Sequence, residues 1–287
     1  PPPTPTPDQW TLPPAQAFGE LEGEGVWQPY LFNDAGDVVA VRTFLQPDPE
    51  RPYAIVAVAA FDLTQTDLNF VLGAKEPSLP DGPTGNGYIP TDHKQAGKLL
   101  ATFNGGFMAT HGAYGAIAGE IVALPAKEGY GTVAIGADGS VQIGVWGEDI
   151  DPEQTYMSVR QNARMVIHNG EINERVYDGD IVTWGGNING DIVTWRSGLG
   201  LSADSNTLYF IAGPSMSMPT LAESFAAIGA PNGILLDINA SWVHFAAIHP
   251  DGDKLIAEPL FPEGMETQVD RYLRQAERDF FYITTSE

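Results

Sequence analysis

The strongest candidate for chemistry is a carboxylate at the end of a run of apolar residues. Gly233-Ile234-Leu235-Leu236-Asp237 is typical of a central strand and continues as Ile238-Asn239-Ala240-Ser241-Trp242. With the two-residue period of a strand, Asp237, Asn239 and Ser241 share one face. A carboxylate in this position is costly unless it is hydrogen-bonded or used in catalysis. Asp237 is therefore a candidate catalytic residue, the alternative being that it only accepts hydrogen bonds from turn amides.

Two further segments are rich in small and polar residues. In Phe103-Asn104-Gly105-Gly106-Phe107 the glycine pair permits a close backbone approach, and Asn104 offers an amide to a ligand. In Trp195-Arg196-Ser197-Gly198 the guanidinium of Arg196 is suited to an oxyanion. The alternatives are a tight strand-to-turn transition for the first segment and a surface ion pair for Arg196.

Charge makes every basic residue informative. The chain has 287 residues, with 14 Lys and Arg against 37 Asp and Glu, so its net charge is −23. Such a protein repels nucleic acid, which excludes that class of partner, and an anionic substrate needs a local positive site. Arg196 is the first candidate for that site, and Arg160 and Arg164 come next. His111 is a candidate proton donor, with a solvated loop histidine as the alternative.

Several kinds of site are absent from the sequence. There is no cysteine, which removes disulfides, thiolate catalysis and cysteine-type zinc sites. The histidines have no metal-ligand spacing, and no P-loop or G-x-S-x-G motif occurs. No cofactor or metal is therefore expected, although the many carboxylates leave a calcium ion open. No apolar run is long enough to span a membrane.

Strands must position most of these residues. Residues 53–61 and 68–72 are expected to form a buried strand pair, and 132–135 with 141–145 a hairpin around Asp138-Gly139. Residues 76–97 are expected to be a loop. Helices are few: one from a capping box at Thr220 to Gly229, and a short one over 268–276. The sequence predicts the α+β class, as a single domain with a twisted mixed β-sheet, several hairpins and few helices.

One short segment is repeated. Gly179-Asp180-Ile181-Val182-Thr183-Trp184 returns 11 residues later as Gly190-Asp191-Ile192-Val193-Thr194-Trp195. Asn189-Gly190 lies between the copies, so we expect two short strands folded on each other. Trp184, Trp195 and Trp242 are candidates for stacking on a ligand, although burial in the core is the commoner fate of tryptophan.

Residues 1–17 begin with a Pro/Thr-rich tract and are expected to form a stiff, solvated linker, with one domain over 18–287. Such a spacer is typical of the segment after a removed signal peptide or an anchor. It favours an extracellular or cell-surface location, with tethering through this linker. The alternative is an arbitrary chain boundary.

Four segments in order resemble the phosphodiester glycosidase family, the domain group related to the mannose-6-phosphate uncovering enzyme. They are ATFNGGF (101–107), WRSGLG (195–200), IAGPSMSMPTLAESFAAIGAPNGILLDINASW (211–242) and RDFFYIT (278–284). The resemblance covers about residues 18–285. Many family members have LDGG where this chain has Leu236-Asp237-Ile238-Asn239, so it is similar to a bacterial type with LDIN.

The resemblance implies hydrolysis of the anomeric C–O bond of a sugar-1-phosphodiester in extracellular or cell-wall glycans. It places Asp237, Arg196, Ser197, Gly198, Asn104, Gly105 and Gly106 at the site. With the candidates chosen above from the residues themselves, the expected catalytic residues are Asp237, Arg196 and His111, with Asp237 as nucleophile or general base. The expected substrate-binding residues are Asn104, Gly105, Gly106, Ser197, Gly198, Asn239, Ser241 and Arg164. A glycan or sugar phosphate is the expected partner. Because the LDIN form replaces glycines near the site, a non-catalytic carbohydrate-binding or cell-surface structural protein is the alternative. An intracellular polysaccharide-synthesis factor is a third hypothesis.

Overall fold

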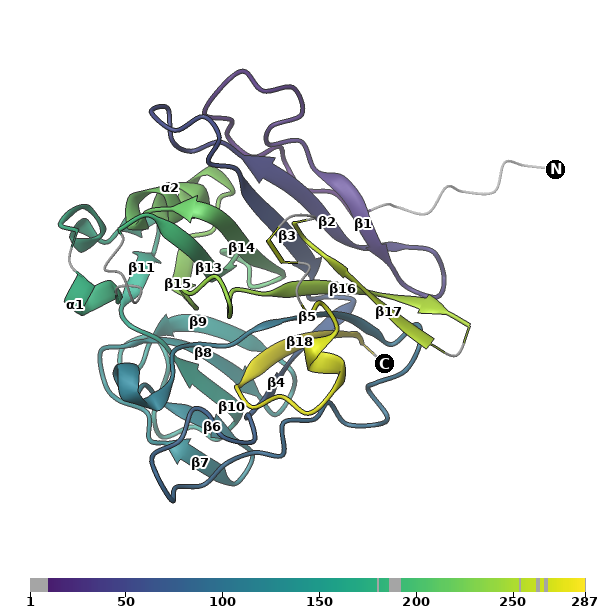
Figure 1. Ribbon diagram of the computed structural model, residues 1–287, viewed down its shortest axis with the longest axis vertical. Helices are drawn as coiled ribbons and strands as arrows, with labels where there is room; N and C mark the ends of the chain where they lie inside the picture. The colour runs from purple at the N-terminus through teal and green to yellow at the C-terminus, as the bar shows by residue number, and fades with distance from the viewer. Residues whose placement is uncertain are drawn as a thin grey trace.

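The computed structural model describes residues 10–179, 181–185, 192–252, 254–261, 264–265 and 268–286. Within these residues the chain is mostly β-structure with two α-helices, and it forms three sheets whose strand pairs are antiparallel (Figure 1). The α+β class with few helices is confirmed. Three antiparallel sheets replace the single mixed sheet expected from the sequence, because successive strands join by hairpins or pass to another sheet.

The largest sheet has eight strands. In spatial order they are β1 (Gln28–Phe32), β2 (Val38–Leu45), β3 (Val56–Asp62), β14 (Thr207–Met216), β13 (Thr194–Leu201), β15 (Asn232–Leu235), β11 (Met165–His168) and β12 (Glu171–Ile172). Helix α2 (Met218–Ala227) packs on one face of this sheet through Leu221 and Phe225. A Cβ atom on Gly198, Gly200 or Gly233 would approach the Phe225 ring to 2.8–2.9 Å. Gly198 therefore serves the packing of this helix.

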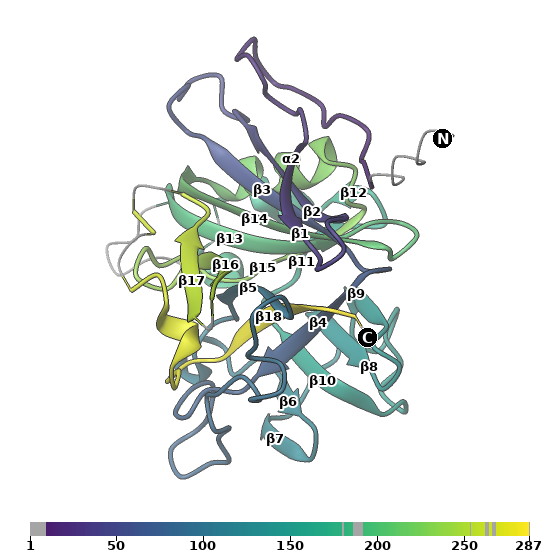
Figure 2. The same ribbon diagram turned by 90° about the vertical axis from the view of Figure 1, so that its right-hand side faces the viewer.

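Two five-stranded sheets complete the domain. One has the order β17 (Lys254–Pro259), β16 (Phe245–Asp251), β5 (Leu99–Asn104), β18 (Phe280–Thr285) and β4 (Thr66–Val71). The other has the order β7 (Ile121–Leu124), β6 (Ala116–Ala118), β10 (Tyr156–Gln161), β8 (Gly131–Gly136) and β9 (Val141–Val145). Figure 2 shows the eight-stranded sheet above and the β6–β10 sheet below, with β5 and β18 between them.

A cluster of phenylalanines joins the sheets. Phe61 and Phe210 of the large sheet pack on Phe103 and Phe245 of the β5 sheet, and Phe103 lies 5.0 Å from Phe210 between ring centroids. Aromatic burial of this kind makes a large contribution to core stability. It brings the end of β5, the segment after β15 and the segment before β18 to one place.

Some local expectations are confirmed. β8 and β9 form the expected hairpin, and residues 76–97 contain no strand or helix. Strands lie at 56–62 and 66–71, but they do not pair with each other: β3 pairs with β2 and β14, and β4 pairs with β18. The turn at residues 63–65 is short enough for a hairpin, yet the chain crosses from one sheet to another there.

The helix predictions need correction at their ends. Helix α2 forms, but its N-cap is Ser217, and Thr220 is the third helical residue whose hydroxyl completes the capping box. Residues 268–276 contain only the 3₁₀ turn η3 (Arg271–Leu273). Other short helical turns are η1 (Ala109–His111), η2 (Glu174–Tyr177) and α1 (Ile181–Trp184).

The repeat is not a strand pair. In the described part of the first copy, Ile181–Trp184 forms α1, and in the second copy Thr194 and Trp195 begin β13. Asp180, Gly190 and Asp191 lie outside the described residues. Trp184 is buried and donates its indole N–H to the carbonyl of Arg175, whereas Trp195 packs edge-on against Phe261. The same sequence thus takes two conformations because its tertiary contacts differ.

Residues 10–17 lie against the domain. Trp10 and Leu12 pack on the core, and the backbone N–H of Ala15 donates to the carbonyl of Gly25. This part of the expected linker is therefore held by apolar contacts, and residues 1–9 lie outside the described residues. No helix among the described residues has the length and apolar character needed to cross a membrane.

Candidate active site

Asp237 lines a cavity of about 370 Å³. The polar residues in its lining are Asp237, Arg278, His111 and Asn239. The remaining wall is aromatic or apolar and consists of Phe107, Met108, Tyr114, Ile181, Val182, Gly185, Ile238 and Trp242. A concave site with a few polar groups on an apolar wall is typical of a small-molecule site.

The Asp237 carboxylate is held at both oxygens. It is 3% exposed, and its Oδ1 accepts hydrogen bonds from the backbone N–H groups of Ile238 (2.7 Å) and Asn239 (2.9 Å). Its Oδ2 pairs with Nη2 of Arg278 at 2.6 Å. Burial raises the pKa of this carboxyl above its usual range, against the opposing effects of Arg278 and the two N–H groups. The group is therefore fixed in position and a better proton acceptor than a surface aspartate.

The strand expected to continue through Ser241 ends at Leu235. Asp237 and Asn239 instead begin turns in which their side chains accept from N–H groups one or two residues ahead. This is the usual behaviour of Asp and Asn at a strand end. Asn239 still reaches the cavity, but Ser241 lines a neighbouring one.

Arg278 supplies the positive charge. Its Nη2 also donates to the carbonyl of Gly106 at 2.7 Å, and its guanidinium carbon lies 4.5 Å from the Trp242 ring centroid. Burial lowers the pKa of Arg278, but the Asp237 and Asp279 carboxylates outweigh this effect and raise it overall. A charged, planar guanidinium stacked on an aromatic ring beside a cavity is well suited to binding a phosphate.

A buried polar network connects Asn104 to Asp237. Asn104 Nδ2 lies 3.0 Å from Ser197 Oγ, and that hydroxyl accepts from the backbone N–H of Asp237 at 3.2 Å. Asn104 Oδ1 also accepts from the N–H of His244. Asn104 and Ser197 therefore position the Asp237 segment from behind, and neither lines the cavity.

Gly105 and Gly106 pack closely against other side chains of the protein and not against an open cavity. A Cβ atom on Gly105 would lie 2.1 Å from Oδ2 of Asp279, and one on Gly106 would lie 2.9 Å from the guanidinium of Arg160. Arg160 and Asp279 form a fully buried ion pair at 2.7 Å, and Arg160 also donates to the carbonyl of Phe107. The two glycines thus let the chain pass over this pair, which fixes Phe107 in the cavity wall.

Arg196 does not converge with Asp237. Adjacent strand residues point to opposite faces, so Ser197 faces Asn104 and Arg196 faces the other side of β13. There it donates to the carbonyls of Met216 and Ile192 and lines a different cavity, of about 280 Å³. Among the described residues its Nη1 has no hydrogen-bond partner, and burial lowers its pKa to about 10.

The remaining predicted residues divide between the cavity and other places. His111 belongs to η1 and lines the Asp237 cavity. Arg164 is exposed, donates to the carbonyl of Gly129, lies over the Tyr130 ring and is not part of the cavity lining. Gly198 is buried under Phe225.

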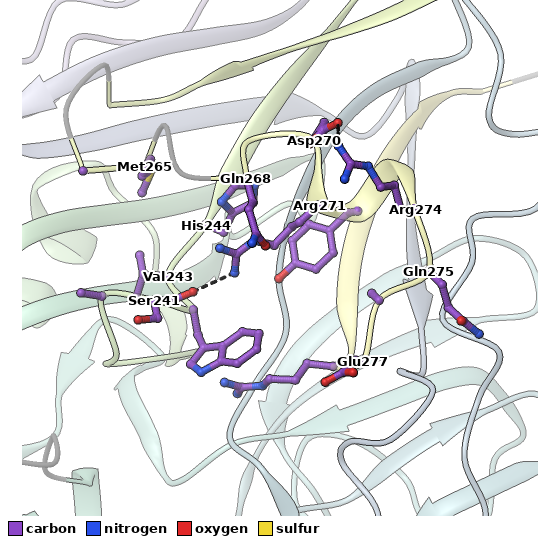
Figure 3. A pocket seen from close by; sticks show the side chains of 16 residues that line it. Ser241, Val243, His244, Met265, Gln268, Asp270, Arg271, Arg274, Gln275 and Glu277 are labelled. Atoms are coloured by element: carbon purple, nitrogen blue, oxygen red, sulfur yellow. Dashed lines mark hydrogen bonds and ion pairs between the residues drawn. The ribbon is translucent and has the colours of Figure 1, made fainter.

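A second cavity shares Trp242 and Arg278 with the first. It measures about 650 Å³, and Figure 3 shows its side chains around Ser241, His244, Gln268 and Arg271. Arg271 donates to the carbonyl of Ser241 and lies over Trp242 at 5.6 Å. Trp242 thus lies close to two guanidinium groups at the boundary of the two cavities.

Within the part of the chain that the structure describes, one group of residues away from the Asp237 cavity has ligand atoms close enough to hold a metal ion. They are Glu148, Asp149 and His168, whose ligand atoms lie within 4.8 Å of one another. Two of the three are exposed, and none lines the Asp237 cavity.

Sequence reasoning missed Arg278, although it begins the RDFFYIT segment. It is separated by 41 residues from Asp237, and the packing of the sheet that contains β5 and β18 against the large sheet brings the two residues together. An Arg-Asp pair directly before an apolar strand in a chain with few basic residues was the available signal.

Comparisons with known proteins give distant likenesses. No family model matches the chain, and no curated protein shows a significant match. Among solved structures, the chain is similar to the catalytic domain of zebrafish N-acetylglucosamine-1-phosphodiester α-N-acetylglucosaminidase, auto-inhibited by its pro-peptide. The identity is 14%, the TM-score 0.48, and 97% of each chain is covered.

Two bacterial structures are also similar. A hypothetical protein from Synechocystis has 10% identity and a TM-score of 0.47, covering 81% of this chain and 59% of the other. A putative exported protein from Burkholderia pseudomallei has 12% identity and a TM-score of 0.42, covering 81% and 74%. These values are too low to identify a residue or an activity.

Proposed function

We propose that the protein is a hydrolase that cleaves the anomeric C–O bond of a sugar-1-phosphodiester in extracellular or cell-wall glycans. The observation that carries the proposal is the Asp237–Arg278 ion pair in the lining of a cavity with an aromatic wall. A phosphodiester needs a cation, and an oxocarbenium-like anomeric carbon needs a carboxylate beside it. The site offers both within 2.6 Å of each other.

In this proposal Arg278 binds the non-bridging oxygens of the phosphate. Asp237 acts as general base: it takes a proton from a water whose oxygen bonds to the anomeric carbon. The bond from that carbon to the phosphate oxygen breaks, and the phosphomonoester leaves with the electron pair. Burial raises the pKa of Asp237, which suits this carboxylate to accept a proton.

Aromatic side chains would position the sugar. Phe107, Tyr114 and Trp242 all line the cavity, and sugar C–H faces stack on such rings. Asn239 and His111 are the side chains available for hydroxyl groups or for protonation of the leaving oxygen. A phosphate leaves readily, so His111 assists the reaction less than Asp237 or Arg278 does.

The test is incubation with methyl diesters of glucose, mannose and N-acetylglucosamine 1-phosphates, in both anomers, with measurement of phosphomonoester release. Wild type should hydrolyse at least one of them, and Asp237→Asn should lower turnover at least a hundredfold. The Asn variant can still accept the two backbone hydrogen bonds, and its thermal midpoint reports whether it folds. A folded and fully active Asp237→Asn variant would falsify the assignment.

The second candidate function is carbohydrate binding without turnover. It is favoured by Ile238, which occupies the cavity wall where glycines occur in the LDGG pattern, and by the nearly complete burial of Asp237. This function predicts binding of the same diesters with no phosphomonoester release by wild type.

The location belongs to the proposal as well. A glycan substrate outside the cell agrees with the Pro/Thr-rich segment before residue 18 and with the strongly acidic composition. Fractionation of cells that express the full-length protein, with detection of the protein at the surface, tests this part.

A further inference from the structure

The Asp237 cavity carries information about the group on the far side of the phosphate, the aglycone. The following inference about the class of diester that fits the cavity rests on the proposed function. Three properties of the cavity bear on it: its charge, the chemistry of its wall and the exposure of its rim.

The charge of the cavity suits one negative charge. Of the described lysines and arginines, Arg278 is the one in the cavity lining, and it is already paired with Asp237. The net charge of the chain is −23, and a second phosphate held inside this cavity would meet no further cation there, since Arg196 and Arg271 belong to the two adjoining cavities. This disfavours a polyanionic chain and favours a single diester.

The wall of the cavity has two chemically different parts. The aromatic rings of Phe107, Tyr114 and Trp242 suit a sugar face. Met108, Ile181 and Val182 present no hydrogen-bonding side-chain group, so they cannot satisfy sugar hydroxyls. They would instead leave a polar aglycone without partners, which costs binding free energy.

The rim of the cavity is apolar and open to solvent. Val182 is 88% exposed and Ile181 is 51% exposed, both on α1. Tyr177 and Ile192, each more than half exposed, line the neighbouring cavity that shares Ile181 and Gly185 with this one; that cavity also contains the buried Arg196. The apolar surface therefore extends outward from the Asp237–Arg278 pair, over a greater length than a methyl aglycone would cover.

We infer that the natural substrate is a monoanionic sugar-1-phosphodiester whose aglycone is an apolar alcohol, and that this aglycone lies on the rim formed by Met108, Ile181 and Val182. Arg278 then holds the phosphate between the sugar, on the aromatic wall, and the apolar chain, on the rim. Hydrolysis releases the sugar and the phosphomonoester of the apolar alcohol.

The test compares methyl and octyl diesters of the same sugar 1-phosphates. Their dissociation constants are measured by calorimetry with Asp237→Asn protein, in which turnover does not interfere, below the concentration at which the octyl diester forms micelles. The octyl diester should bind at least tenfold more tightly than the methyl diester. Val182→Ser, introduced in the same background, should bring the ratio of the two constants close to one. Val182 is almost fully exposed, so folding should be unaffected.

The matched control is Val122→Ser, which removes an exposed valine from β7. It should leave the octyl-to-methyl ratio as in the parent protein. Equal constants for the two diesters, or no binding of either, would overturn the inference. The inference would also be overturned if Val182→Ser keeps the ratio of the octyl and methyl dissociation constants but no longer binds phosphatidylcholine vesicles or no longer self-associates. The rim would then be a contact with a membrane or with a second subunit.

Failure of the proposed function is recognised separately. If wild type releases no phosphomonoester from any diester, the hydrolase assignment fails whatever the binding ratio. If it hydrolyses methyl and octyl diesters with equal kcat/KM and binds them equally, the hydrolase assignment stands and the apolar aglycone is rejected.

Discussion

Arg278 and Asp279 are adjacent in the chain, but their ion pairs differ. Asp279 pairs with Arg160 in a place where both side chains are almost completely buried, whereas Arg278 pairs with Asp237 at a cavity. The first pair closes the structure around Gly105 and Gly106. The second has room beside it for a ligand. Burial of a charge pair therefore does not by itself indicate function; access to a cavity distinguishes the two.

The largest expected effect is the loss of stability when the fully buried Arg160–Asp279 pair is broken. Asp279→Asn leaves the charge of Arg160 buried without compensation and should lower the free energy of unfolding by about 3–5 kcal/mol. Urea denaturation measures this loss. The control is Asp270→Asn, which breaks an exposed pair with Arg274 and should cost less than about 1 kcal/mol. Similar losses in the two variants would contradict the distinction.

The next expected effect is a dependence of stability on pH that comes from His244. This residue is buried, and its Nε2 lies 3.0 Å from the carbonyl oxygen of Val269. Burial lowers its pKa from 6.5 to about 4. Between these values the unfolded state binds a proton that the folded state does not, so stability falls as pH falls from about 6.5 to about 4. The loss should be roughly 3 kcal/mol.

Urea denaturation at several pH values tests this expectation against His244→Gln, whose amide can still donate to Val269. The variant should show a smaller loss over the same interval, because other groups titrate equally in both proteins. Identical pH dependence in the two proteins would show that His244 is not responsible.

A smaller effect on stability is expected when the Arg278–Asp237 pair at the cavity is changed. Arg278→Lys keeps the charge beside Asp237 but loses the planar fork and its stacking on Trp242. Turnover of a sugar-1-phosphodiester should fall about 10- to 100-fold, with a smaller loss of stability than in Asp279→Asn. Arg164→Lys, at an exposed arginine outside the cavity, should retain activity within about twofold.

Arg196→Gln should have a smaller effect than Arg278→Lys. Arg196 is on the opposite face of β13 from Ser197, and a glutamine retains a donor for the neighbouring carbonyls. We expect kcat/KM to change less than about threefold. A loss as large as that of Arg278→Lys would show that Arg196 acts in the reaction after all.

The sequence predicted local features better than long-range ones. Alternating apolar residues and Asp-Gly located β8 and β9, and the isolated apolar run before Asp237 located β15. The pairing partners of β3 and β4 could not be predicted, because period-two patterns show which residues are buried but not which strand lies next to them.

In the candidate site, too, residues close together in the sequence were predicted better than residues that meet only in the fold. Asp237 was identified from the cost of placing a carboxylate after a buried strand, and Asn239 was found from its position beside it. Arg196 was preferred because of its small neighbours, but Ser197 faces Asn104, and strand alternation then directs Arg196 away. Arg278 comes from a distant part of the chain, and its approach to Asp237 depends on the packing of the sheet that contains β18 against the large sheet.

Hydrolysis of a sugar-1-phosphodiester in ¹⁸O-labelled water tests the central claim most directly. If Asp237 activates water at the anomeric carbon, the label appears in the C1 hydroxyl of the sugar, the phosphomonoester contains none, and Asp237→Asn abolishes this incorporation. Label in the phosphomonoester would contradict the account, because attack would then occur at phosphorus.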